Sequence, residues 1–222
     1  MNLSVIITAG GIGKRFSSKV PKQFLSIIGT PILMHTINTF HNWGAINEIM
    51  LTLPREWAGY WEELTKKHDF KIPHKVVDGG KERYHSIKNA LDMCSGDYVM
   101  IHDGVRPLVD KGTLNRCFNA LKNNKAVVPY VELKDSIREL NKGNSTSKDR
   151  KNYVSVQTPQ CFDLKLIQKA YQVDYQGIFT DDASVAEHSG MEIYLVEGNE
   201  ENLKITTSID FNIAESLIKK VK

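Results

Sequence analysis

Short apolar runs alternate along the chain with longer segments whose apolar residues recur at helical spacing. The runs predict β-strands, and they lie at Leu3–Thr8, 46–53, Lys75–Asp78, 98–102, 126–131 and 193–197. Between most of them, amphipathic segments predict helices at 31–40, 56–68, 84–93, 112–121 and 164–171. Alternating strands and helices are typical of a mostly parallel sheet covered on both faces. We therefore expect an α/β fold with three layers, formed by one domain over residues 1–222.

Residues 133–154 interrupt this alternation with a long polar segment. It has no helical periodicity and too few apolar residues for a core, but Lys142-Gly143-Asn144 predicts a turn between β-compatible residues at 136–138 and 153–155. We therefore expect a projecting β-hairpin arm. An arm that cannot bury itself on its own domain is expected to pack against a second subunit, which predicts a homodimer; a floppy surface loop is the alternative.

Composition restricts the classes of protein to which the chain can belong. Apolar residues make up 41% of the 222 residues and charged residues 25%, as in ordinary globular proteins. The small net charge of +3 argues against a nucleic-acid partner, and no apolar run approaches the ~20 residues needed to span a membrane. Three widely spaced cysteines match no metal site or disulfide framework, and the N-terminus has no signal-peptide pattern, so we expect a cytoplasmic protein.

The first strand runs directly into a glycine-rich segment that carries several cations. Residues 9–24 read AGGIGKRFSSKVPKQF. Bare backbone N–H groups and cations at the end of a buried strand are the chemistry of a polyphosphate site. The spacing excludes two familiar loops, because the dinucleotide fingerprint needs a third glycine where Phe16 stands, and the Walker A loop needs Gly at Thr8 and Ser or Thr at Arg15.

A second glycine segment follows the third predicted strand. Gly79-Gly80 opens a helix, and the N-terminus of that helix, together with Ser86, offers N–H and hydroxyl groups to a base edge or a phosphate. An ordinary glycine turn with a capping serine is the alternative.

The fourth predicted strand ends in a carboxylate. A buried strand end is unfavourable for Asp103 unless the side chain is paired or bound to a cation, and Arg106 stands three residues further on. A purely structural ion pair between these two residues is the alternative to a ligand site. We expect the neighbouring His102 to pack rather than to catalyse.

Polar segments also lie in the last third of the chain. The stretch 180–187 predicts the start of a helix, with Thr180 or Asp181 as the cap and acids in the first turn. Adjacent acids also suggest the metal motif of sugar-nucleotide-dependent glycosyltransferases, but in a helical first turn they point in different directions around the axis. Lys204 lies between apolar neighbours, an unusual place for a charge that only increases solubility.

Taken in order, these segments resemble the 2-C-methyl-D-erythritol 4-phosphate cytidylyltransferase family of the non-mevalonate isoprenoid pathway. The resemblance spans nearly the whole chain and implies a Rossmann-like nucleotidyltransferase domain. It rests on Ala9-Gly10-Gly11-x-Gly13-x-Arg15 with Pro21-Lys22-Gln23, Gly79-Gly80-x-x-Arg83-x-x-Ser86, His102-Asp103-x-x-Arg106-Pro107, Asp135-Ser136, Thr158-Pro159-Gln160, Thr180-Asp181-Asp182-Ala183-Ser184 and Asn202-x-Lys204-Ile205-Thr206.

The resemblance also implies roles for individual positions. In the family, the glycine loop wraps the CTP triphosphate, charged residues stabilise the transition state, and a second loop reads the cytosine. The implied catalytic residues are Arg15, Lys22 and Lys204, and the implied nucleotide-binding residues are Ala9, Gly10, Gly11, Gly13, Gly79, Gly80, Ser86 and Asp103. Asp103 matches a residue near the magnesium and the ribose, so the resemblance implies Mg²⁺ as cofactor. The implied contacts of the acceptor are Arg106, Asp135, Ser136, Arg150 and Thr180, with Arg150 reaching the substrate of the neighbouring subunit.

The reaction of this family fits an active-site sequence that is rich in glycine and cations. A phosphomonoester acceptor is mostly dianionic at pH 7 because its second pKa is ~6, so it needs no general base. In-line attack on the α-phosphorus instead brings two polyanions together, and Mg²⁺, Arg and Lys supply the electrostatic stabilisation.

Some positions depart from the family pattern and leave alternatives for the acceptor. Gly104-Val105 stand where the family often has two alanines, and the pentitol-phosphate cytidylyltransferases usually carry Val before this Arg. Ser136 and Arg138 replace the usual Thr and Lys, whereas the segment 180–184 is closer to the methylerythritol enzymes. We expect transfer of CMP from CTP to 2-C-methyl-D-erythritol 4-phosphate. The alternatives are a ribitol-5-phosphate cytidylyltransferase and a regulatory nucleotide-binding module without turnover.

Overall fold

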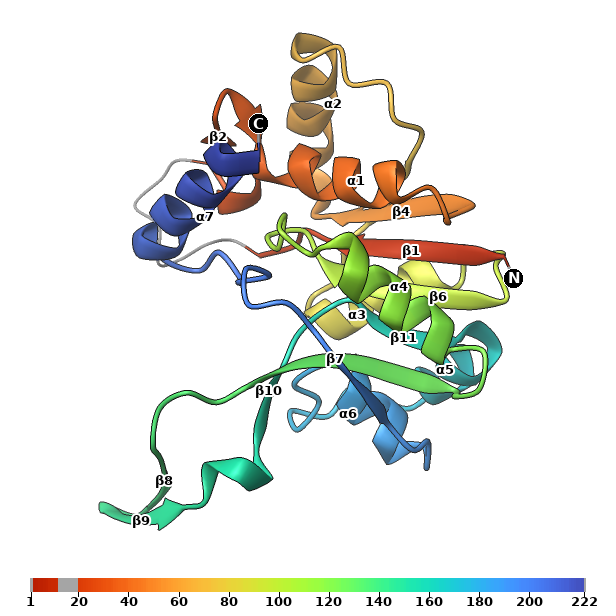
Figure 1. Cartoon of the computed structure of the whole chain (residues 1–222). Helices are drawn as coiled ribbons and strands as arrows, with labels where there is room; N and C mark the ends of the chain where they lie inside the picture. Colours follow the sequence, from red (N-terminus) through yellow and green to blue (C-terminus); the bar gives the residue numbers. More distant parts are fainter. Residues whose placement is uncertain (1, 12–19, 222) are drawn as a thin grey trace.

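A single mixed sheet forms the centre of the protein (Figure 1). The computed structural model describes residues 2–11 and 20–221, so Gly13 and Arg15 of the expected site lie outside the described residues. In spatial order the strands are β12 (Tyr194–Glu197), β7 (Ala126–Glu132), β10 (Val154–Val156) with β11 (Gln160–Asp163), β6 (Tyr98–Asp103), β1 (Leu3–Thr8), β4 (Glu48–Leu53) and β5 (Lys75–Asp78).

Most strand pairs in this sheet are parallel, as the sequence predicts. β1 pairs in parallel with β4 and β6, β4 with β5, and β7 with β12. Two short strands that the sequence pattern does not reveal, β10 and β11, run antiparallel to β7. Val127 pairs with both Cys161 and Tyr194, which places β11 and β12 on opposite sides of β7 and makes β12 the edge strand.

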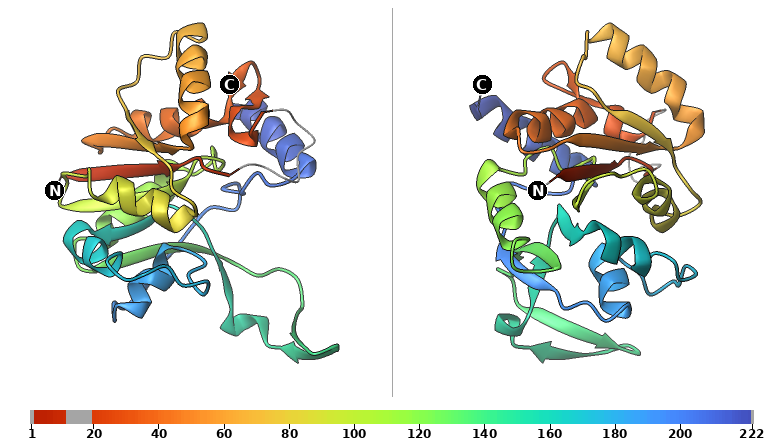
Figure 2. Two further views of the ribbon diagram at one scale, coloured as in Figure 1. Left: turned by 180° about the vertical axis from the view of Figure 1, so that it is seen from behind. Right: turned by 90° about the vertical axis from the view of Figure 1, so that its right-hand side faces the viewer.

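Helices cover both faces of the sheet (Figures 1 and 2). One face packs against α1 (Ile32–Trp43), α2 (Ala58–Lys67) and α4 (Lys111–Ala120), and the other against α3 (Arg83–Leu91), α5 (Leu164–Ala170) and α6 (Asp182–His188). Buried residues alternate between the two cores along each strand, so that Val5 and Ile7 face one core and Ile6 faces the other. The expected three-layer α/β fold is confirmed.

A third apolar cluster lies beside the sheet and involves the C-terminal helix. α7 (Ser208–Val221) contributes Ala214 and Ile218, which are buried in one cluster with Ile27 of β2 (Ser26–Ile27) and Val105. β2 forms a small hairpin with β3 (Thr30–Pro31). Our prediction from sequence contains neither this hairpin nor α7. Both are needed to enclose the segment that carries Val105 beyond the end of β6.

The segment 133–154 forms an arm that projects away from the sheet (Figures 1 and 2). β8 (Ile137–Asn141) and β9 (Asn144–Lys148) pair antiparallel around a turn at Lys142 and Gly143, both with positive φ, so the expected hairpin and turn are present. One part of the prediction is wrong: residues 153–155 are not the second strand of the hairpin. From Val154 onward the chain belongs to β10 and pairs with Glu132 of the central sheet.

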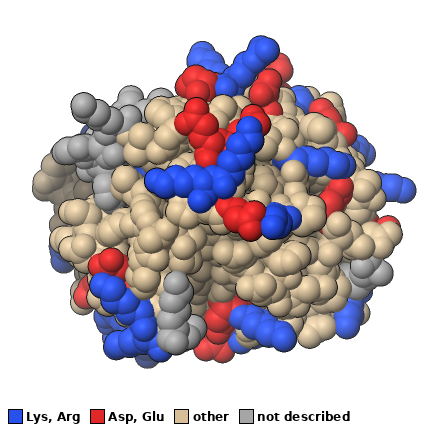
Figure 3. Space-filling view, turned by 90° about the horizontal axis from the view of Figure 1, so that it is seen from above, with Lys and Arg blue, Asp and Glu red and all other residues tan. Residues whose placement is uncertain are grey.

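Charges of both signs lie on the face of the molecule that Figure 3 shows. On the face shown in Figure 3, basic and acidic side chains are interspersed and do not form one basic surface. Among the described residues, no helix is long and apolar enough to cross a membrane.

A buried polar network around His102 links β6 to the chain between β10 and β11. His102 is fully buried and packs edge-on against Phe40, as the sequence predicts. Its Nε2 lies 2.9 Å from the Arg106 carbonyl and therefore donates, while its Nδ1 accepts from the Thr158 hydroxyl at 3.0 Å. The same hydroxyl accepts from the N–H of Asp103 at 3.1 Å. This pattern is complete only when the imidazole is neutral.

The neutral imidazole predicts a loss of stability in mild acid. Burial lowers the pKa of His102 to about 4, whereas a histidine in an unfolded chain titrates at about 6.5. Between these values the unfolded state binds more protons, so the free energy of unfolding falls as the pH drops, by roughly 3 kcal/mol in total. Urea unfolding of the wild type between about pH 7 and pH 4.5 measures this effect. His102→Gln is the control, and its free energy of unfolding should lose this part of the pH dependence. Equal slopes of unfolding free energy against pH in both proteins would contradict the assignment of the effect to His102.

Candidate active site

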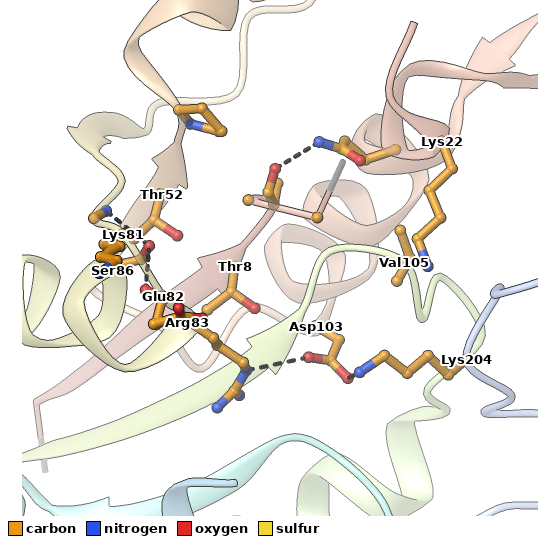
Figure 4. A pocket seen from close by; sticks show the side chains of 16 residues that line it. Thr8, Lys22, Thr52, Lys81, Glu82, Arg83, Ser86, Asp103, Val105 and Lys204 are labelled. Carbon is orange, nitrogen blue, oxygen red and sulfur yellow. Dashed lines mark hydrogen bonds and ion pairs between the residues drawn. The ribbon is translucent and has the colours of Figure 1, made fainter. Parts of the chain in front are cut away.

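A cavity of ≈ 400 Å³ opens at the carboxyl ends of β1, β4 and β6 (Figure 4). This is the edge at which ligands bind in open α/β sheets. Three strand ends contribute Thr8, Thr52 and Asp103 to its wall. The cavity also brings together eight of the residues expected from sequence, namely Ala9, Gly10, Gly11, Lys22, Gly80, Ser86, Asp103 and Lys204.

The first wall of the cavity is the chain that leaves β1. The N–H of Ala9 donates to the Thr52 carbonyl at 3.0 Å, which continues the β1–β4 ladder by one residue before the glycines begin. The buried Gln23 side chain then donates from Nε2 to the Ala9 carbonyl at 2.6 Å. Lys22, beside it in a 3₁₀ turn (Lys22–Phe24), extends its amine into the cavity in Figure 4.

The opposite wall is the loop between β5 and α3, and it leaves little space for side chains. The N–H of Gly79 donates to the Leu53 carbonyl at 2.7 Å, and a Cβ on Gly79 would lie 3.1 Å from that oxygen. A Cβ on Gly80 would lie 2.3 Å from the Cβ of His85. Close approach therefore requires glycine at position 80, and at position 79 a side chain would crowd the Leu53 backbone. Gly80 lines the cavity, whereas Gly79 packs behind it against β4.

The Ser86 hydroxyl holds this loop in shape. It accepts from the N–H of Gly80 at 2.9 Å and lies 3.2 Å from the Glu82 carbonyl, to which it donates. In this arrangement its proton is engaged within the loop, and Ser86 offers an acceptor to a ligand. These contacts are those of a capping serine, which was one of the two interpretations of Ser86 from sequence. The side chain also lines the cavity.

The centre of the cavity is the carboxylate of Asp103, which is surrounded by cations. Lys204 Nζ lies 3.0 Å from Oδ2, Arg106 Nε 3.2 Å from Oδ2, and Arg83 Nε 3.6 Å from Oδ1. Burial alone would raise the pKa of Asp103, but the charges of Arg83, Lys204 and Arg106 outweigh it and hold the pKa well below its usual range. Asp103 is therefore ionised. The sequence predicts that a carboxylate at the end of β6 needs a cationic partner, and Asp103 has three.

Arg83 connects the cavity to the N-terminus of α6. Its guanidinium binds both carboxylate oxygens of the fully buried Asp182, at 2.8 and 2.7 Å, and the Tyr171 hydroxyl donates to the same carboxylate at 2.6 Å. The helix cap itself is Asp181, one of the two caps expected from sequence, and it forms a capping box with Ser184. Of the two adjacent acids, Asp181 thus caps the helix and Asp182 forms an ion pair.

The residues expected to bind the acceptor lie around the cavity rather than in its wall. Arg106 pairs with Asp103 and donates to the Asn202 carbonyl at 2.7 Å. Thr180 lines a small hollow that Arg83 also borders. Asp135, Ser136 and Arg150 belong to the arm region, outside the cavity wall. Their roles stay predictions.

Three of the other residues that line the cavity received no role in our prediction from sequence. Arg83 belongs to the Gly79-Gly80-x-x-Arg83 segment, but only the fold brings it to Asp182, which is 99 residues away in sequence. Gln23 belongs to the Pro21-Lys22-Gln23 segment of the resemblance, which assigned it no role. Thr52 is the second-to-last residue of the apolar strand β4 and carries no local signal of a functional role.

The donor set of the cavity fits a magnesium ion that arrives with a nucleotide. Within residues 2–11 and 20–221, no three His, Cys, Asp or Glu side chains gather as they would around a protein-only metal site. Mg²⁺ in nucleotide enzymes is usually held by one or two carboxylates together with phosphate oxygens and water. Asp103 supplies one such carboxylate to the cavity wall.

Comparison with known proteins identifies the same family across the whole chain. The family profile described as 2-C-methyl-D-erythritol 4-phosphate cytidylyltransferase matches residues 3–220. A protein of that name from Bacteroides fragilis is 45% identical over 216 residues, covering 97% of this chain and 99% of the relative. One from Clostridium perfringens is 40% identical over 220 residues, covering 96% and 97%. The crystal structure of 4-diphosphocytidyl-2C-methyl-D-erythritol synthase from Anaerococcus prevotii matches with a TM-score of 0.84 and 27% identity, over 98% of both chains. The chain belongs to the 2-C-methyl-D-erythritol 4-phosphate cytidylyltransferase family.

Proposed function

We propose that this protein transfers CMP from CTP to 2-C-methyl-D-erythritol 4-phosphate, releasing pyrophosphate and forming 4-diphosphocytidyl-2-C-methyl-D-erythritol for isoprenoid precursor synthesis. The observation that carries the proposal is the cavity wall, which combines glycine backbone with Lys22 and with the Asp103 carboxylate, to which Arg83 and Lys204 are paired. Family membership supplies the identity of both substrates. The relatives that match across the chain favour this acceptor over ribitol 5-phosphate, although Val105, the residue that the pentitol enzymes usually carry before this Arg, lines the cavity.

The two walls of the cavity suit the two ends of CTP. Gly80 and Ser86 form the narrow wall, which would receive the flat base, while Gly10 and Gly11 would offer backbone to the triphosphate. Lys22 and Lys204 then lie where negative charge increases as the α-phosphorus is attacked. Lys204 is bound to Asp103 in this structure, so it is already held at the cavity wall before a phosphate is present.

The chemistry requires charge and alignment more than proton transfer. An acceptor phosphate oxygen attacks the α-phosphorus of CTP, and the bond from that phosphorus to the bridging oxygen of pyrophosphate breaks. The attacking phosphate is mostly ionised at neutral pH, so no base has to remove a proton from it. In agreement, the described cavity wall contains no histidine or cysteine.

We also propose that activity depends on Mg²⁺, held by Asp103 and by the phosphates of CTP. The ion would neutralise phosphate charge and help to orient the triphosphate. The residues of the chain do the rest: Arg83 and Arg106 keep the Asp103 carboxylate ionised and oriented, and Lys204 can move from that carboxylate to a phosphate oxygen.

We also propose that the protein is a cytoplasmic homodimer, and the arm supports the dimer. Leu140 on the arm is 85% exposed, and Tyr153 at its base is 45% exposed. A second cavity of ≈ 360 Å³ lies at this base, between Arg150 and Leu195 of the edge strand. Apolar side chains and a hollow next to a projecting hairpin are best covered by a second copy of the chain. Arg150 would then face the partner.

An acceptor panel tests the proposed reaction. We expect pyrophosphate release from CTP with 2-C-methyl-D-erythritol 4-phosphate, little release with ribitol 5-phosphate, and none after Mg²⁺ is removed with EDTA. Tight CTP binding without pyrophosphate release from any polyol phosphate would instead support the regulatory module. A preference for ribitol 5-phosphate would transfer the assignment to the pentitol enzymes.

Substitution of Lys22 tests the electrostatic mechanism. Lys22→Ala should lower kcat by at least about 10²–10³-fold, because one preorganised charge contact in a transition state is worth that much. The circular dichroism spectrum and Tm should stay close to those of the wild type. Lys66→Ala, which removes an exposed lysine on α2 that pairs with Glu62, is the matched control and should keep full turnover. Near-normal turnover of Lys22→Ala would contradict the catalytic role.

Deletion within the arm tests the proposed dimer. Removing residues 141–148 takes away the turn and β9 while leaving β10 and the central sheet intact. Light scattering should show weaker dimerisation, since the arm would no longer reach the partner. A dimer of unchanged strength would show that the arm is a surface loop.

A further inference from the structure

Thr52 is a buried residue whose hydroxyl has no hydrogen-bond partner within the described part of the chain. It is the fifth residue of β4 and is fully buried. A valine has the same shape and would fill this position without an unpaired polar group, so a hydroxyl here weakens the folded protein. Gln23 shows the same feature, because its Oε1 also has no partner in the described residues. Both side chains line the cavity.

The fold directs the Thr52 side chain toward the base-binding wall. Successive residues of a strand face opposite sides of the sheet, and Met50, two residues earlier, belongs to the core beneath α3. Thr52 therefore faces the same side as Ser86 of α3. Thr52, Ser86 and Lys81 all line the cavity, as Figure 4 shows.

The backbone on each side of Thr52 is bound to the two loops that form the proposed nucleotide site. Its carbonyl accepts from the N–H of Ala9, and the carbonyl of the next residue, Leu53, accepts from the N–H of Gly79. These bonds fix the position of the hydroxyl relative to both loops. A base that enters the cavity between the two loops would reach Thr52 near the end of β4.

Of the two hydroxyls on this wall, that of Thr52 has no acceptor for its proton among residues 2–11 and 20–221. Ser86 uses its proton within the loop in this arrangement and offers an acceptor to a ligand. A cytosine ring presents acceptors at O2 and N3, which need donors. Resting on the proposed function, the geometry points to Thr52 as a further nucleobase contact, with its hydroxyl donating to a ring acceptor of the pyrimidine of CTP.

This assignment predicts that one substitution stabilises the free protein and weakens nucleotide binding. Thr52→Val removes the unpaired hydroxyl at constant shape, so Tm of the ligand-free protein should rise by about 2–4 °C. The dissociation constant of CTP, measured by titration calorimetry with Mg²⁺, should increase by about 3- to 10-fold. Thr52→Ser keeps the hydroxyl and should bind CTP close to the wild-type affinity.

Two controls separate this contact from a general structural effect. Thr36→Val is a matched substitution at a fully buried threonine whose hydroxyl is bonded to the carbonyls of Ile32 and Gly104, so its Tm should fall. Inorganic tripolyphosphate probes the phosphate end alone, and its affinity for Thr52→Val should equal that for the wild type.

Several outcomes would overturn the inference. Unchanged CTP affinity in Thr52→Val would show that the hydroxyl does not contact the base. Equal weakening of CTP and tripolyphosphate would place its effect at the phosphates, and a lower Tm would show that the hydroxyl has a partner in the folded protein. A wild-type protein that binds tripolyphosphate but not CTP would contradict the proposed function itself, and this contact with it.

Discussion

The buried carboxylate of Asp103 is the constraint on which the rest of the site depends. A charge at the end of a central strand is unfavourable unless opposite charges surround it. Here the partners come from three separate parts of the chain: Arg83 from the start of α3, Arg106 from the loop after β6, and Lys204 from the segment before α7. One ion cluster therefore joins the nucleotide loop, the central sheet and the C-terminal region. It also gathers cations at the cavity in which we propose that CTP binds.

The wider site follows from how that cluster is anchored. Arg83 reaches Asp103 while its guanidinium is held by Asp182, whose carboxylate also receives the Tyr171 hydroxyl. Removing one member of such a buried pair leaves an uncompensated charge, so each partner depends on the other. The hydroxyl network at His102 and Thr158 supports the same strand end through the backbone N–H of Asp103. The polar groups next to the carboxylate are thus largely satisfied by the protein.

Against this background, the unpaired groups in the cavity wall stand out. The Thr52 hydroxyl and the Gln23 Oε1 have no partner among the described residues, although buried polar groups are usually bonded. Binding sites commonly lower stability in this way, because groups positioned for a ligand are unsatisfied without it. The same position can therefore be suboptimal for folding and favourable for recognition.

The sequence alone determined the three-layer class, most of the parallel strands and the helices on both faces, because these follow from local periodicity. It also predicted which segments meet at the cavity, since glycine turns and cations that follow strand ends gather at one edge of a parallel sheet. It did not reveal β11, which is short and leads directly into α5, or the end of the arm hairpin, where residues 153–155 pair with β7 instead. Only the tertiary structure decided that Arg83 pairs with Asp182, that the Ser86 proton is engaged within its own loop, and that Thr52 faces the cavity. These facts depend on contacts between residues far apart in sequence, or on which hydrogen bonds form and which remain unmade in the folded chain. A local sequence pattern contains neither kind of information.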